Sequence, residues 1–72
     1  MDEKWIKIYT SGNPIHIDIL QNMLLDENIK SVFIDKKDSA YLFGDIELYV
    51  QQAHVLAARQ IINRFEENET TG

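Results

Sequence analysis

The stretch from Asn13 to Ile34 constrains the fold most, because it predicts a capped amphipathic helix that leads directly into a β-strand. Asn13 is a good N-cap, since its side chain can accept a hydrogen bond from an unpaired backbone N–H. Pro14 suits the first helical position, where no amide hydrogen is needed. The apolar residues that follow recur at helical spacing: Ile15, Ile19, Leu20, Met23 and Leu24. A helix with this apolar side needs a sheet to cover.

Asn28 is expected to end this helix. Asparagine tolerates the left-handed conformation that the first residue beyond a helix often adopts, so Ile29 would fold back against Leu24 in a Schellman-type stop. The next residues, 31–36, alternate between aliphatic and other side chains, which predicts a strand. We therefore expect a positive φ at Asn28 and a very short connection from helix to strand.

Two further strands and a second helix are predicted on either side of this unit. Residues 4–10 and 46–50 alternate with a period of two, which is typical of half-buried strands. Residues 52–66 return to the helical period and carry one apolar face. The sequence thus predicts a single domain over residues 4–66, followed by a disordered tail at 67–72.

The order β-α-β-β-α predicts an α+β open sandwich with both helices on one face of a three-stranded sheet. The short connection between the second and third strands makes them antiparallel. If the first strand pairs with the free side of the third, the sheet order is 1-3-2, a ferredoxin-like split βαβ without its final strand. The residues expected to share one buried face are Ile6, Ile8, Val32, Ile34, Leu48 and Val50 from the strands, with Leu20, Leu24, Ala58 and Ile62 from the helices.

Charge and cysteine content exclude several classes of partner. The net charge of −5 opposes the attraction to phosphate groups that carries most non-specific nucleic-acid binding, and it also disfavours anionic membranes. The 72 residues include no cysteine, so disulfides and zinc–thiolate clusters cannot supplement the core. The first residues lack the features of a signal peptide. We expect a cytoplasmic protein that contacts neither nucleic acid nor membrane.

No catalytic or metal-binding motif stands out. His16 and His54 are the only histidines, and neither has a second histidine at ligand spacing. Ser39 follows an acidic residue, but no G-x-S-x-G motif surrounds it, and the glycines form no phosphate-binding motif. We therefore expect no metal, no cofactor and no enzymatic activity.

The sheet face away from the helices is the first candidate site. If the aliphatic residues point into the core, four aromatic side chains point outward together as an interaction face: Trp5, Tyr9, Phe33 and Tyr49. Together they could exceed the apolar patch that a monomer tolerates. This favours self-association, as a homodimer, or binding to a protein partner, with Trp5 and Tyr49 as central anchors. The alternative is that the N- and C-terminal segments, or long lysine side chains, cover these rings. An open aromatic sheet could also stack on single-stranded RNA, but such proteins pair stacking with a basic groove. This chain is acidic, which disfavours RNA as the partner.

The connection between the second and third strands is the second candidate site. It combines charge, hydroxyl groups and apolar residues, which loops that bind a small ligand or a partner often do. The alternative is a hairpin whose Leu42 or Phe43 plugs the end of the core. The candidate residues are Lys36, Lys37, Asp38, Ser39 and Tyr41.

Residues 4–66 resemble a known family. The residues that carry the resemblance are Trp5, Tyr9 and Thr10, the helix end from Leu24 to Ile29, the strand from Ile46 to Val50, and Ala58, Ile61 and Ile62. They resemble the domain of unknown function 2007 family of prokaryotic signal-transducing proteins, although that family usually has glycine where this chain has Asn28. The resemblance implies a ferredoxin-like fold similar to PII-like and ACT-like domains and defines no catalytic residue.

By analogy, the resemblance implies a bacterial regulatory or binding module that acts through protein or small-ligand contact. The alternatives are a subunit with a purely structural role and a small enzyme acting at residues 36–44. An enzyme would need acid–base or nucleophilic groups that meet in a pocket.

Overall fold

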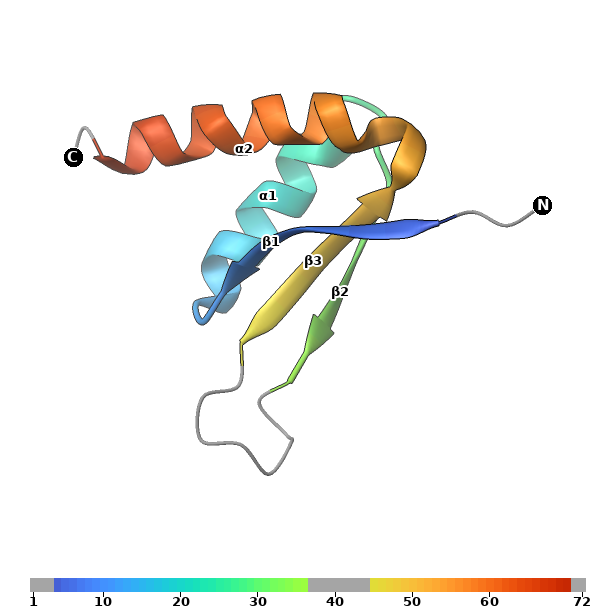
Figure 1. The fold of residues 1–72 in the computed structure, drawn as a ribbon. Coiled ribbons are helices and arrows are strands. Elements are labelled where there is room, and N and C mark those ends of the chain that lie inside the picture. The colour runs from blue at the N-terminus through green and yellow to red at the C-terminus, as the bar shows by residue number, and fades with distance from the viewer. Residues whose placement is uncertain (1–3, 37–44, 71–72) are drawn as a thin grey trace.

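A computed structural model describes residues 4–36 and 45–70 of the chain (Figure 1). The elements follow the predicted order. They are β1 (Trp5–Ser11), α1 (Pro14–Asp26), β2 (Ser31–Asp35), β3 (Ile46–Gln51), the short 3₁₀ turn η1 (Gln52–His54) and α2 (Val55–Thr70).

The three-stranded sheet has the order β1-β3-β2, and β3 pairs antiparallel with both neighbours. Both helices lie on one face of this sheet (Figure 1). Among the strands, α1 packs mainly against β2 and α2 mainly against β1. This arrangement confirms the predicted α+β ferredoxin-like fold, with one sheet face left uncovered by helices.

The two ends of α1 also form as the sequence predicts. The Asn13 side chain accepts a hydrogen bond from the backbone N–H of Ile15 at 2.9 Å, and Pro14 occupies the first turn. At the other end Asn28 adopts a φ of 62°. The backbone N–H of Ile29 donates to the carbonyl of Leu24 at 2.9 Å, which is the Schellman hydrogen bond.

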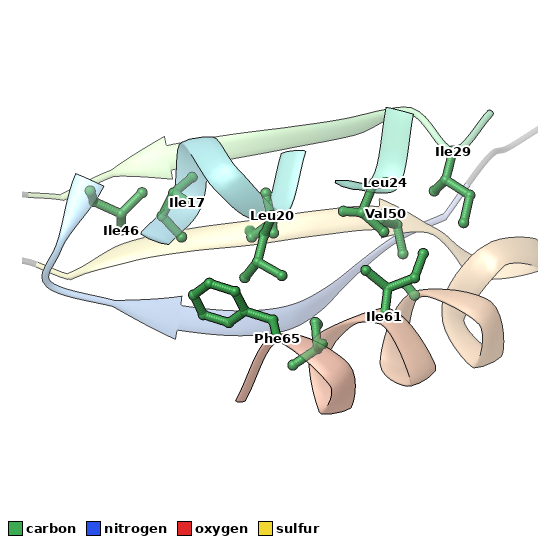
Figure 2. Packing of buried hydrophobic residues seen from close by; sticks show 11 residues of the cluster. Ile17, Leu20, Leu24, Ile29, Ile46, Val50, Ile61 and Phe65 are labelled. Atoms are coloured by element: carbon green, nitrogen blue, oxygen red, sulfur yellow. The ribbon is translucent and has the colours of Figure 1, made fainter. Parts of the chain in front are cut away.

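The core lies between the sheet and the two helices (Figure 2). Leu48 and Val50 of the central strand are fully buried, as predicted, against Leu20 and Leu24 of α1. Further buried side chains come from all parts of the fold: Ile17, Ile29, Ile46, Ala58, Ile61, Ile62 and Phe65. Ile6 and Ile8 are only partly buried, because β1 lies at an edge of the sheet.

The prediction that Val32 and Ile34 belong to the core is wrong. The strand runs in the predicted direction, but its other set of side chains faces the helices. Phe33 pairs with the buried Leu48 and therefore lies on the helix side of the sheet, while Val32 and Ile34 lie on the open side and are exposed. The Schellman stop explains this. It fixes Ile29 inward, where that residue is buried, and alternation along the extended chain then places residues 31, 33 and 35 on the same side.

The prediction that Tyr9 points outward is also wrong, and the cause is a β-bulge in β1. The pairing register shifts between Lys7 and Tyr9, which leaves Ile8 without a partner in β3. One extra residue reverses the alternation, so Tyr9 pairs with the buried Leu48 and lies on the core side. There its ring meets the ring of Phe65 edge to face, with centroids 6.3 Å apart.

The last helix is longer than expected. It follows η1 directly and continues from Val55 through Thr70, so the structure describes residues 67–70 of the predicted tail as the end of α2, while residues 71 and 72 lie outside the described residues. Glutamate is a good helix former, and Glu66 and Glu67 therefore let the helix continue beyond its apolar face.

Candidate interaction face

The sheet face opposite the helices, which we call the open face, is built by alternation along the strands. Glu47 and Tyr49 of β3 point away from the buried residues 46, 48 and 50. Their partners in the neighbouring strands point the same way, because residues directly opposite each other in an antiparallel pair share a face. The open face comprises Trp5, Lys7 and Thr10 of β1, Val32 and Ile34 of β2, and Glu47 and Tyr49 of β3.

Of the four aromatic residues predicted for this face, the structure places only two there. Trp5, which is 39% exposed, and Tyr49 lie on the open face. Tyr9 lies on the core side, and Phe33 lies on the helix side with its ring exposed. The apolar residues that sequence reasoning missed are Val32 and Ile34; the inward-pointing Ile29 was the signal that could have found them.

An ionic network on the open face joins β1 and β3 to Lys36, the residue directly after β2. The Lys7 ammonium lies 3.4 Å from one Glu47 carboxylate oxygen, and the Lys36 ammonium lies 3.4 Å from the other. The Tyr49 hydroxyl donates a hydrogen bond of 2.7 Å to Glu47. Neighbouring groups cover the Glu47 side chain to 13% exposure, while both lysines stay about half exposed. The face therefore presents apolar side chains around a neutralised carboxylate and two cations.

This network shifts two pKa values in opposite directions. The hydrogen bond from Tyr49 is the main reason why the pKa of Glu47 is lowered, with Lys7 and Lys36 adding to the effect. The same hydrogen bond raises the pKa of Tyr49, and desolvation adds to it. The stabilisation from Glu47 is present above its unfolded pKa and is lost as the pH falls through its lowered folded pKa. The stabilisation from Tyr49 is present below pH about 10 and is lost as the pH rises through its raised folded pKa.

We expect Tyr49 to titrate above the ordinary tyrosine pKa of about 10, and Glu47→Gln to lower that pKa because it removes the negative charge beside the hydroxyl. NMR titration of ¹³C-labelled tyrosine would measure both values. Asp35→Asn is the control, because Asp35 lies on the other side of the sheet; it should leave the pKa of Tyr49 unchanged. A Tyr49 pKa that does not respond to Glu47→Gln would contradict the hydrogen bond.

Most of the candidate ligand loop lies outside the described residues. This applies to Lys37, Asp38, Ser39 and Tyr41. Lys36 is described, and its backbone N–H donates to the carbonyl of Asp45 at 3.2 Å. Its ammonium belongs to the ionic network of the open face. The loop therefore stays a candidate, and Lys36 connects it to the open face.

The histidines occupy structural positions. The His16 ring meets the Phe65 ring edge to face, with centroids 5.4 Å apart, and its Nδ1 lies 3.4 Å from the Ser11 hydroxyl. That hydroxyl also accepts a hydrogen bond from the backbone N–H of Asn13 at 3.0 Å, so it helps to form the turn before α1. His54 lies half-buried in η1. Within the described residues, no three His, Asp or Glu side chains come together as a metal site.

The fold and the open face define a small ferredoxin-like domain with an uncovered apolar and ionic sheet surface. Comparison with known families identifies it further: residues 5–66 match the domain of unknown function 2007 family, described as "putative prokaryotic signal transducing protein", and the chain belongs to this family. Comparisons with curated proteins and with solved structures returned no match. No helix in the described part of the chain is long and apolar enough to cross a bilayer.

Proposed function

We propose that this protein is a non-catalytic, cytoplasmic binding module in bacterial signal transduction, and that it acts by contacting protein through its open face. The family's description supports the signalling role. The observation that carries the choice of surface is that Trp5, Val32 and Ile34 stay exposed there, while both helices occupy the opposite side (Figure 1). Apolar groups gathered on one face of a small domain favour a protein interface.

The chemistry of the open face fits such an interface. Trp5 and Tyr49 are rigid aromatic anchors, the residue types that most often dominate binding energy. Lys7 and Lys36 surround them with half-exposed cations whose partner, Glu47, is already neutralised. A binding protein can thus cover the centre of the face without leaving an unpaired carboxylate in the interface. A second copy of the chain and a different protein are both suitable partners for this surface.

Site-specific photocrosslinking in the host cell tests this proposal, because it captures whichever protein lies against the chosen position. A photoreactive phenylalanine derivative at Thr10, which is exposed on the open face, should give a discrete crosslinked band. The same group at Gln60, which is exposed on α2, is the matched control and should give none. A band at twice the chain mass identifies a second copy.

Trp5→Ala together with Tyr49→Ala should abolish the Thr10 crosslink, since truncating an anchor residue costs about 2 kcal/mol, or roughly a 30-fold loss of affinity. Circular dichroism should show unchanged helix content, because neither side chain belongs to the buried core. A Thr10 crosslink that survives the double substitution, or crosslinks from Gln60 alone, would refute the open face as the contact surface.

A further inference from the structure

The second feature of this fold that needs a partner is the edge strand β2. Three successive apolar side chains are exposed on it: Val32 at 43%, Phe33 at 51% and Ile34 at 48%. Val32 and Ile34 point to the open face and Phe33 points to the helix side, so β2 exposes apolar side chains on both sides of the sheet. Among the described residues, β2 pairs with β3 alone. An exposed apolar edge is a template for pairing with another strand.

The two edges of the sheet differ in this respect. At β1, the bulge between Lys7 and Tyr9 interrupts the regular pairing, and bulges are one way in which proteins protect an edge. The pairing of β2 with β3 is continuous from Ser31 to Asp35 without a bulge. Of the two edges, β2 is thus the one suited to accept a strand.

Two neighbouring cavities lie beside this edge, between β2 and α1. Their volumes are about 290 Å³ and about 270 Å³, and Asp18 and Gln21 line both of them. Buried apolar side chains form part of the floor, and Ile17 and Ile46 lie together at one end of the core (Figure 2). The Gln21 side chain donates a hydrogen bond of 3.4 Å to the Ser31 carbonyl, which links α1 to the start of β2. We call this feature the β2 groove.

The acidic residues that line the β2 groove favour a basic ligand. Asp18 lines both cavities, and Asp35 lines the larger one. Lys30 contributes the cation among the lining residues, in the smaller cavity. The whole chain carries a net charge of −5. An incoming segment therefore gains most if it brings Lys or Arg side chains to Asp18 and apolar side chains to Phe33.

We propose that the β2 groove binds an extended, basic segment of a partner protein, which adds to the sheet as a fourth strand beside β2. Main-chain hydrogen bonds along Val32 to Ile34 supply affinity, and alternate side chains of the segment enter the groove and supply specificity. β2 has five residues, a span of about 17 Å, so the segment is short. This contact goes beyond the open face and does not need its anchors, Trp5 and Tyr49.

A second copy of this chain fits the groove less well. Antiparallel pairing of β2 with itself about Phe33 would set Lys30 of one copy opposite Lys36 of the other. Like charges directly opposite each other destabilise a strand pair. Two chains of the same net charge would also repel each other. The basic segment avoids both costs, and the groove carboxylates favour it.

NMR of the ¹⁵N-labelled protein with designed peptides tests the proposal. A nine-residue peptide that alternates lysine with valine should shift the amide signals of residues 32–34 and slow their hydrogen exchange. A peptide that alternates glutamate with valine should bind at least tenfold more weakly, because it opposes Asp18. An N-methylated copy of the lysine peptide, which cannot donate backbone hydrogen bonds, should not bind.

Two variants on α1 separate groove binding from general charge attraction. Asp18→Asn should weaken binding of the lysine peptide about two- to fivefold, as expected for one exposed charge pair. Asp26→Asn removes the same charge from the same helix but lines a different cavity, next to α2, and should change affinity less than twofold. The Trp5→Ala, Tyr49→Ala variant should bind the peptide normally.

Three outcomes would overturn the proposal: no binding of the lysine peptide at millimolar concentration, equal binding of its N-methylated copy, or signal changes confined to β1. Each of these leaves the photocrosslinking result at Thr10 unaffected, so failure of the β2 groove and failure of the open face are distinguishable.

Discussion

Leu48→Ala is expected to lower the free energy of unfolding by about 2–5 kcal/mol. Leu48 is fully buried at the centre of β3, where it pairs with Tyr9 on one side and Phe33 on the other. The substitution removes apolar contact and leaves a cavity that the two flanking strands cannot collapse to fill. Small domains have about 5–15 kcal/mol of stability in total, so the loss is a large fraction of it. Urea denaturation followed by circular dichroism would measure the change.

The matched control is Leu25→Ala, the same chemical change on the exposed side of α1. It should alter the free energy of unfolding by less than about 0.5 kcal/mol. Equal effects of the two substitutions would contradict the assignment of Leu48 to the centre of the core.

Phe65→Ala is expected to cost about 3–5 kcal/mol. Phe65 is buried on α2, and its ring holds two other elements in place: Tyr9 of β1, edge to face, and His16 of α1. Its removal should therefore loosen the contact of α2 with both elements. Thermal unfolding should show a lower midpoint, and hydrogen exchange in β1 should accelerate.

Phe33→Ala provides the comparison for the same change of side chain. Because about half of the Phe33 surface is exposed, its truncation should cost only about 1–1.5 kcal/mol. A cost close to that of Phe65→Ala would mean that Phe33 is covered in solution, which would count against an open β2 groove.

The sequence predicted the features that depend on local chemistry. Asn13 and Pro14 define the start of α1, and Asn28 ends it, because each of these residues suits one particular backbone conformation. Leu48 and Val50 alternate with residues that are clearly more polar or aromatic, so the buried side of β3 was evident.

The prediction of which side chains face the core failed in β2 and β1, where the local sequence does not determine the buried face. Val32, Phe33 and Ile34 are all apolar, so alternation is ambiguous, and the orientation of β2 follows from the preceding helix stop at Ile29. In β1, the bulge at Ile8 depends on pairing with a strand far away in the sequence, and no local pattern specifies it.

The predicted interaction face is correct for two of its four aromatic residues. Trp5 and Tyr49 lie on the open face as predicted, because the first precedes the bulge and the second lies on β3. Tyr9 and Phe33 do not, for the reasons given. That the open face binds a partner stays a prediction. The β2 groove was not foreseen, since it needs the spatial arrangement of α1 beside an edge strand.

The pairing of β1 with β3 has a consequence for the order of events during protein synthesis. Lys7 and Glu47, which meet on the open face, are 40 positions apart in the chain. At about 5–20 residues per second, a ribosome needs roughly 2–8 s to make that interval. Until β3 has been made, β1 has no strand with which to pair. During that time Ile6 and Ile8 are exposed to solvent or contact other molecules. Substitutions that weaken β3 should therefore have two effects. They lower the stability of the folded core, and they prolong the time during which β1 of a new chain can pair with another polypeptide.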